Sequence, residues 1–101
     1  MATFRFTGGM QYRTQQEGVD ADAWLTNWRG QHAAEITSAT QNLLTSGIQD
    51  DGQGCVCELD FDLWFDTNID NVQATYLSEI THAIYDIGTV AAADCNSYLD
   101  G

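Results

Sequence analysis

Residues 55–68, CVCELDFDLWFDTN, alternate between apolar and polar side chains along most of their length. This alternation predicts a half-buried β-strand, because successive side chains of a strand point to opposite faces of its sheet. The odd-numbered positions form the expected core face: Cys55, Cys57, Leu59, Phe61, Leu63 and Phe65. The even-numbered positions are mainly acidic, so the strand is expected to present a row of carboxylates on its other face.

The negative charge of the chain is concentrated in its second half. The sequence holds 15 acids against three arginines and no lysine, for a net charge of -12. Residues 1–49 have a balance of -1, whereas residues 50–101 hold eleven acids and no base. Such a surface repels nucleic acid and anionic membranes and attracts basic partners. Adaptation of a halophilic source to salt is the alternative, although it would acidify the whole surface.

Length and composition predict one folded domain, residues 1–101. Apolar residues make up 44% of the chain, which suffices for a single modest core. No apolar run could span a bilayer, and the N-terminal residues lack the apolar stretch of a secretory signal. Three cysteines, an odd number, do not suggest a disulfide framework and are expected to be reduced. We therefore expect a cytoplasmic protein, in the host cytoplasm if it is encoded by a phage.

The first half of the chain predicts a hairpin and a helix. Residues 3–14 read as two strands joined by a loop at Gly8-Gly9-Met10, which would place Arg5 opposite Arg13. Asp20 is a suitable N-cap for a helix whose apolar residues recur at steps of three and four. Gly30 could kink or split this helix. The apolar positions are Leu25, Trp28, His32, Ile36, Ala39 and Leu43.

The second half predicts a strand and another helix. After the strand at residues 55–66, Thr67 or Asn68 is expected to cap a helix that ends near Gly88. The apolar stripe of this helix is Ile69, Val72, Tyr76, Ile80, Ala83 or Ile84, and Ile87. For the remaining C-terminal residues, a short final helix is the favoured prediction. The order is thus ββαβα with a possible short C-terminal helix. It predicts an α+β two-layer sandwich, in which a three-stranded antiparallel sheet has helices packed on one face and its other face open.

The acidic row on the expected open face resembles a row of phosphates in its spacing. Alternate strand residues lie roughly 6.6–6.8 Å apart. Phosphates advance ~3.4 Å per nucleotide along the axis of one strand, and their true separation is about twice that distance. A basic groove on another protein would suit such a row, although a simply solvated strand face explains the same residues. If Arg5 or Arg13 lies beside the strand, one or two acids would be neutralised.

Trp64 interrupts the acidic face of this strand. It could anchor a binding surface, because tryptophan is enriched at interface hot spots, or it could pack under a terminal helix. The predicted partner-binding residues are Glu58, Asp60, Asp62, Trp64 and Asp66 on the strand, with Asp50 and Asp51 from the preceding loop.

Metal sites are poorly supported by the spacing of possible ligands. Asp66, Asn68 and Asp70 imitate the start of a calcium loop, but Leu77 stands where the bidentate glutamate is needed. Cysteines and histidines could supply zinc ligands, but they lack paired zinc-finger spacing, and buried thiols are the expected state. The residues in question are Cys55, Cys57, Cys95, His32 and His82. We expect no metal and no cofactor.

The function that these features favour is non-enzymatic binding. The sequence contains no phosphate-binding glycine loop, nucleophile elbow or zinc-protease motif. An acidic surface of this kind would dock on a basic, nucleic-acid-binding surface of a partner protein and inhibit it. In general character, short acidic chains without catalytic motifs resemble phage anti-defence (anti-CRISPR-like) inhibitors. The alternatives are a subunit of a homo-oligomer or viral assembly, and an acidic protein from a halophile.

Overall fold

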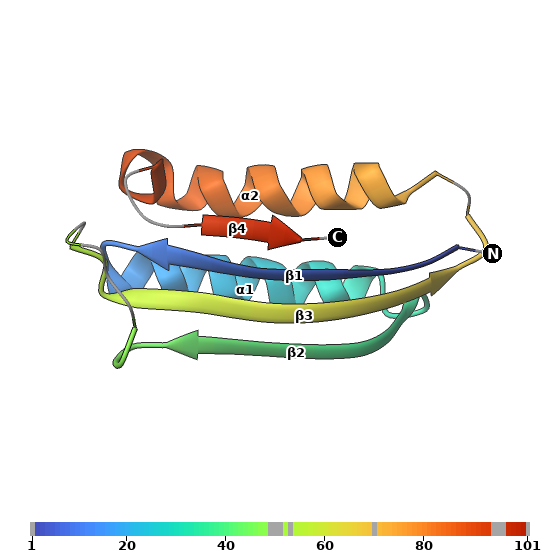
Figure 1. The fold of residues 1–101 in the computed structure, drawn as a ribbon, viewed down its shortest axis with the longest axis horizontal. Coiled ribbons are helices and arrows are strands. Elements are labelled where there is room, and N and C mark those ends of the chain that lie inside the picture. Colours follow the sequence, from blue (N-terminus) through green and yellow to red (C-terminus); the bar gives the residue numbers. More distant parts are fainter. Residues whose placement is uncertain (1, 49–51, 53, 70, 94–96, 101) are drawn as a thin grey trace.

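The computed structural model describes residues 2–48, 52, 54–69, 71–93 and 97–100. Within them the strands form one antiparallel sheet in the order β2-β3-β1-β4 (Figure 1). The elements follow the order βαββαβ, the split arrangement of ferredoxin-like folds. They are β1 (Ala2–Tyr12), α1 (Gln15–Gln31), β2 (Ile36–Leu44), β3 (Cys57–Thr67), α2 (Gln73–Ala93) and β4 (Ser97–Asp100).

The predicted α+β class and the antiparallel arrangement of β2, β3 and β1 are confirmed. One face of the sheet packs against both helices and forms the core. Its side chains come from even positions of β1 and odd positions of β3, which pair in register as Phe4 with Phe65 and Phe6 with Leu63. Tyr12 is fully buried in this core and donates a hydrogen bond to the Ile84 carbonyl oxygen at 3.0 Å. This bond ties the end of β1 to α2.

The predicted hairpin at residues 3–14 is wrong, because Gly8 and Gly9 continue a single strand. β1 lies between β3 and β4, so ladder pairing on both sides keeps it extended through the glycines. Gly8 pairs with Phe61 and Gly9 with Asp60. The expected pairing of Arg5 with Arg13 is consequently wrong as well, and Arg5 lies opposite Trp64.

The predicted first helix begins and ends too late. Thr14 caps it instead of Asp20: its hydroxyl accepts the backbone N–H of Glu17 and also donates to the Glu17 carboxylate. Thr and Glu three residues apart have the sequence pattern of a capping box, but here the carboxylate accepts from the Thr14 hydroxyl and not from its backbone N–H. The helix ends at Gln31, and the apolar positions from Ile36 onward belong to β2. Pairing with β3 provides the stabilisation that favours a strand there.

The end of the chain also differs from expectation. The predicted buried stripe of α2 is confirmed at Tyr76, Ile80 and Ile84. The predicted start is wrong, because α2 begins at Gln73, and Ile69, which precedes it, is exposed. The helix continues past Gly88 to Ala93, through an alanine-rich turn that favours helix. The expected short final helix is wrong, because Ser97–Asp100 forms β4 and pairs with the free edge of β1.

A close approach between α1 and the sheet depends on one glycine. Gly18 is buried within the helix, and a Cβ atom there would overlap the Cys57 Sγ atom and lie 3.2 Å from Leu43 Cδ1. Gly30, in the last turn of the same helix, has no atom within 4 Å of the equivalent position. The two glycines therefore separate the effect of packing from that of helix propensity.

We expect Gly18→Ala to lower the free energy of unfolding by about 1–3 kcal/mol, because a methyl group cannot fit unless the Cys57 and Leu43 side chains move. Gly30→Ala is the matched control and should be neutral or stabilising by up to about 1 kcal/mol. Urea unfolding of both variants measures the difference. Equal effects of the two substitutions would show that α1 does not approach the sheet as closely as described.

Candidate partner-binding surface

The acidic row predicted from the sequence lies on the open face of the sheet. β3 has β1 on one side and β2 on the other, so its even-numbered side chains occupy the middle of that face. Asp60 pairs with Gly9 and Asn42, and Asp62 pairs with Thr7 and Thr40. The residues paired with these two acids are uncharged, so none of them offsets the charge of the carboxylates.

One acid of the row is neutralised within the protein, as the sequence suggested for an arginine beside this strand. The Arg5 guanidinium donates two hydrogen bonds to Asp62, both of 2.9 Å, through Nε and Nη2. This hydrogen bonding and the positive charge of Arg5 lower the pKa of Asp62. The guanidinium carbon also lies 4.7 Å from the ring centroid of Trp64. Asp62 therefore contributes little free charge to the surface.

Glu58 and Asp60 form a second part of the row with different electrostatics. Gln11 donates a hydrogen bond of 2.7 Å from Nε2 to the Glu58 carboxylate. Partial burial, followed by the adjacent Glu58 carboxylate, raises the pKa of Asp60 to about 6. Asp60 Oδ1 is buried and accepts no hydrogen bond from the residues that the structure describes. The Asp60 carboxylate is thus held in an unfavourable charged state.

The remaining predicted site residues lie at the ends of the row. Asp66 belongs to the same face and has a buried Oδ1 without a hydrogen-bond partner among the described residues. Trp64 is 45% exposed and lies on the face opposite to the helices, so it does not pack under α1 or α2. Asp50 and Asp51 lie outside the described residues, so the structure does not place them relative to the row.

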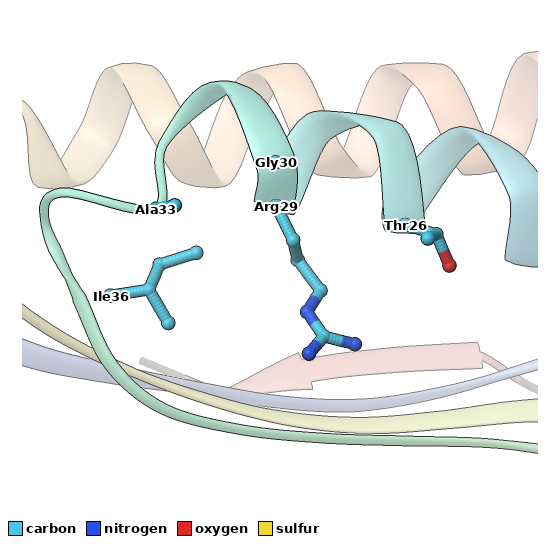
Figure 2. Close-up of a pocket in the computed structure, with 5 residues that line it drawn as sticks. All are labelled: Thr26, Arg29, Gly30, Ala33 and Ile36. Atoms are coloured by element: carbon cyan, nitrogen blue, oxygen red, sulfur yellow. The ribbon is translucent and has the colours of Figure 1, made fainter.

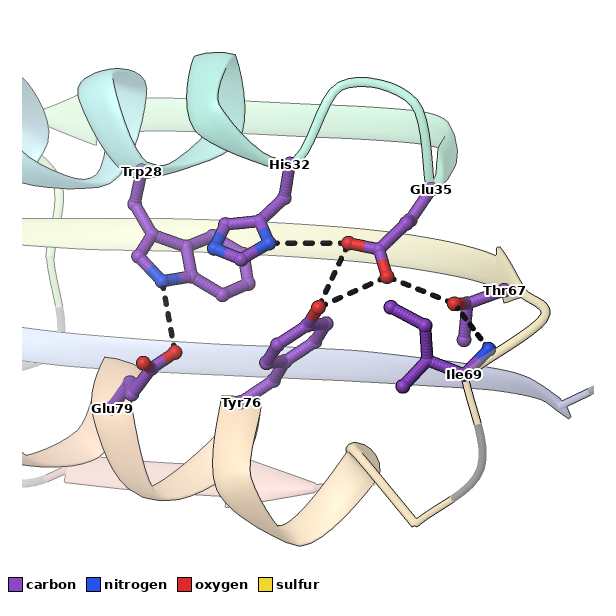
Figure 3. Close-up of polar contacts among 7 residues, drawn as sticks. All are labelled: Trp28, His32, Glu35, Thr67, Ile69, Tyr76 and Glu79. Carbon is purple, nitrogen blue, oxygen red and sulfur yellow. Dashed lines mark hydrogen bonds and ion pairs between the residues drawn. The ribbon is translucent and has the colours of Figure 1, made fainter.

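A polar cluster that the sequence did not predict lies at the end of the sheet, centred on Glu35 (Figure 3). Its carboxylate accepts hydrogen bonds from Thr67 at 2.8 Å and from the Tyr76 hydroxyl at 2.8 and 2.9 Å. The ring Nδ1 of His32 lies 3.2 Å from the same carboxylate. Thr67 also accepts the backbone N–H of Ile69. The cluster joins the end of α1, the start of β2, the end of β3 and α2.

The electrostatics of this cluster indicate a structural role. Burial alone would raise the pKa of Glu35, but the hydrogen bonds from Thr67, Tyr76 and His32 outweigh it and lower the pKa. Burial and the Glu35 carboxylate raise the pKa of Tyr76 to about 12. His32 is half-buried between the rings of Trp28 and Tyr76, as expected for a hydrogen-bonded core histidine. Glu35 accepts bonds from every side and has little capacity left for a ligand.

The cysteines differ from the expected set of reduced thiols. Cys57 is a buried free thiol whose pKa is raised by burial. Cys55 is disulfide-bonded, so the prediction is wrong for this residue. It lies two residues before the start of β3, outside the strand ladder. Cys95 lies outside the described residues. Because Cys55 is disulfide-bonded, the cysteine content no longer argues for a reducing compartment.

The described residues lack two features that would indicate other functions. They contain no group of three or more histidine, cysteine or acidic side chains placed to hold a metal ion. None of the described helices has the length and apolar character needed to cross a membrane.

A shallow hollow of about 360 Å³ lies between α1 and the edge strand β2 (Figure 2). It is lined by Thr26, Arg29, Gly30, Ala33 and Ile36. Arg29 extends toward the sheet and donates a hydrogen bond to Gln41 at 2.9 Å. The hollow is on the helical side of the sheet and is separate from the acidic row.

Comparisons with known proteins leave the function open. No protein-family model matches the sequence, and curated proteins give no significant match. Among solved structures, the chain is similar to a formyltetrahydrofolate deformylase from Pseudomonas putida KT2440, with 13% identity and a TM-score of 0.49. The similarity covers 99% of this chain and 29% of that chain. A likeness at this level says nothing about the activity of the present protein.

The pKa of Asp60 predicts a measurable effect on stability. Since it is raised from 3.8 to about 6 on folding, the folded state binds more protons in that interval. Asp60 therefore makes the free energy of unfolding fall as pH rises from about 4 to about 6. We expect Asp60→Asn to stabilise the protein by about 1–2 kcal/mol at pH 7, because it removes this unfavourable charge. The value is smaller than the full pKa shift implies, since Asp60 retains some contact with solvent.

The stabilisation by Asp60→Asn should largely disappear near pH 3.5, where wild-type Asp60 is mainly protonated in both states. Thermal or urea unfolding of the two proteins between pH 3.5 and pH 8 measures this difference. A variant that is less stable than wild type at pH 7 would contradict the assignment of Asp60 as an unfavourably buried carboxylate.

Proposed function

We propose that this protein is a non-enzymatic binding protein that docks the open face of its sheet onto a basic, nucleic-acid-binding surface of a partner protein. The observation that carries the proposal is the acidic row at the centre of a face that the helices leave uncovered. Arg5 is the only base among the described strand residues of this face, and Asp62 already binds it.

The pairing of Arg5 with Asp62 changes how the row would be recognised. Free negative charge remains at Glu58 and Asp60 on one side of the pair and at Asp66 on the other. The residues of the row repeat at roughly 6.6–6.8 Å, a spacing comparable to that of phosphates along one nucleic-acid strand. A partner with two clusters of Lys or Arg would fit this division better than one with a continuous basic stripe.

Asp60 would gain most from such a partner. Its carboxylate is held beside Glu58, and its pKa of about 6 reflects partial burial and that neighbouring charge. A Lys or Arg side chain placed beside the pair would offset both effects and favour the ionised form. Docking should therefore release protons at pH values near 6.

Trp64 would provide the apolar contact of the interface. Nearly half of the residue is exposed in the middle of a charged face. The Arg5 guanidinium lies over its ring, and Asp62 holds that guanidinium, so the ring is supported before binding. Preorganised aromatic side chains of this kind dominate the energetics of many protein interfaces.

Occupation of a basic surface by this face would exclude nucleic acid from the partner. This competition makes the protein an inhibitor, with the general character of the phage anti-defence proteins described above. Its compartment would be that of the partner, and the cytoplasm is our proposal.

Affinity capture from a lysate tests the proposal with charge-matched variants. Glu58→Gln with Asp60→Asn neutralises the free acids of the row, whereas Asp20→Asn with Asp86→Asn removes two exposed acids from the helices. We expect the row variant to lose at least about tenfold in affinity for the captured partner, and the helix variant to lose little. Binding should weaken as salt rises, and excess duplex DNA should compete with the wild-type protein for that partner.

The proposal fails if both variants recover the same partners equally well, or if DNA does not compete. An acidic surface that serves only salt tolerance predicts a different result. In that case the purified protein would unfold at low salt, and neither pair of substitutions would change what it captures.

A further inference from the structure

The edge strand β2 lacks the protection that exposed sheet edges normally have. It is the outermost strand on one side of the sheet, and its described pairing is with β3 alone (Figure 1). Its nine residues, ITSATQNLL, contain no charged side chain and no proline. Natural edges are usually guarded by charges, proline or bulges, because their unpaired backbone groups can bind another strand. Here the only irregularity lies at one end, between Ile36 and Ser38.

α1 runs beside this edge in the direction opposite to β2. Gly18 lies near Leu43, and Gln41 donates hydrogen bonds to Asp22 at 2.6 Å and to Thr26 at 3.1 Å. The hollow between α1 and β2 therefore opens beside the free edge (Figure 2). Both the strand and the helical layer are accessible to a partner at this side of the molecule.

We propose that β2 pairs with β2 of a second copy of this chain, antiparallel and about a two-fold axis at Thr40. Thr40 is the middle residue of Ile36–Leu44, so this register matches Ser38 with Asn42 and Thr40 with its own copy. Each of these pairs is uncharged and lies on the open face. The two four-stranded sheets would become one continuous sheet of eight strands, with all helices on the same side.

Charges on α1 are complementary under the same symmetry. α1 is antiparallel to β2, and the part of the helix that lies beside Thr40 is its middle, between Asp22 and Arg29. The two-fold axis therefore brings Arg29 of one copy level with Asp22 of the other. With strands about 4.8 Å apart and α1 over β2 and β3, the two helices would be roughly 10–14 Å apart. Arg29, which donates to Gln41 in the single chain, would turn away from the sheet to span that gap across the facing hollows.

The electrostatics favour a second copy at this edge over self-association through the open face. Two molecules with a net charge of -12 repel each other, and the acidic row would meet its own copy in a face-to-face dimer. The uncharged edge avoids that contact and leaves both acidic rows free. Added salt should therefore strengthen this dimer, whereas it should weaken docking on a basic partner. The inference does not depend on the proposed function.

Sedimentation equilibrium of the purified full chain tests the inference, with concentration and salt varied independently. We expect a reversible dimer. Thr40→Lys places two like charges at the axis and should raise the dissociation constant at least about tenfold. Thr3→Lys, an exposed position on the same face in β1, is the matched control and should leave it unchanged. Circular dichroism confirms the fold of each variant.

Charge reversal on α1 provides a second measurement. Arg29→Glu would face Asp22 of the other copy and should weaken the dimer, and the double variant Arg29→Glu with Asp22→Arg should restore it. A monomer at every concentration and salt would overturn the inference. A dimer that tolerates Thr40→Lys, or a double variant no tighter than the single one, would also overturn it, because the contact would then lie elsewhere.

Discussion

The alternation of side chains along β3 is the constraint on which the rest of the structure depends. Its odd-numbered residues fill the core against both helices, and this burial fixes the register with β1 and β2. A shift of one residue would bury the acids and expose the apolar set, so no neighbouring register competes. The position of the acidic row on the open face thus follows from the same interactions that hold the protein together.

The sequence predicted elements with strong patterns and failed where distant pairing decides the conformation. The core face of β3 and the buried stripe of α2 were predicted because their periods are clear. Gly8 and Gly9 were read as a turn, although the spacing of Phe4, Phe6, Met10 and Tyr12 continues through them. The Thr14-x-x-Glu17 pattern is a local signal for the start of α1, whereas β2 and β4 depend on ladder partners remote in sequence.

The sequence predicted which residues of β3 form the candidate site, but not which of them keep a free charge. The five residues predicted on β3 share one face, as alternation requires. Which acid is neutralised depends on the position of Arg5 beside β3, and this follows from the actual path of β1. The cluster around Glu35 could not be predicted, because four separate elements supply its members. The Glu35 cluster therefore holds the end of the sheet together, whereas the free charge lies on the open face.

The central claim is that the open face recognises basic groups. Amide chemical-shift mapping of the chain during titration with a lysine- and arginine-rich peptide tests it most directly. We predict that the largest shifts occur at Glu58, Asp60, Trp64 and Asp66 and at their neighbours in β1 and β2, and that they shrink as salt rises. Shifts confined to the helices, or shifts at the row that persist in high salt, would contradict this account.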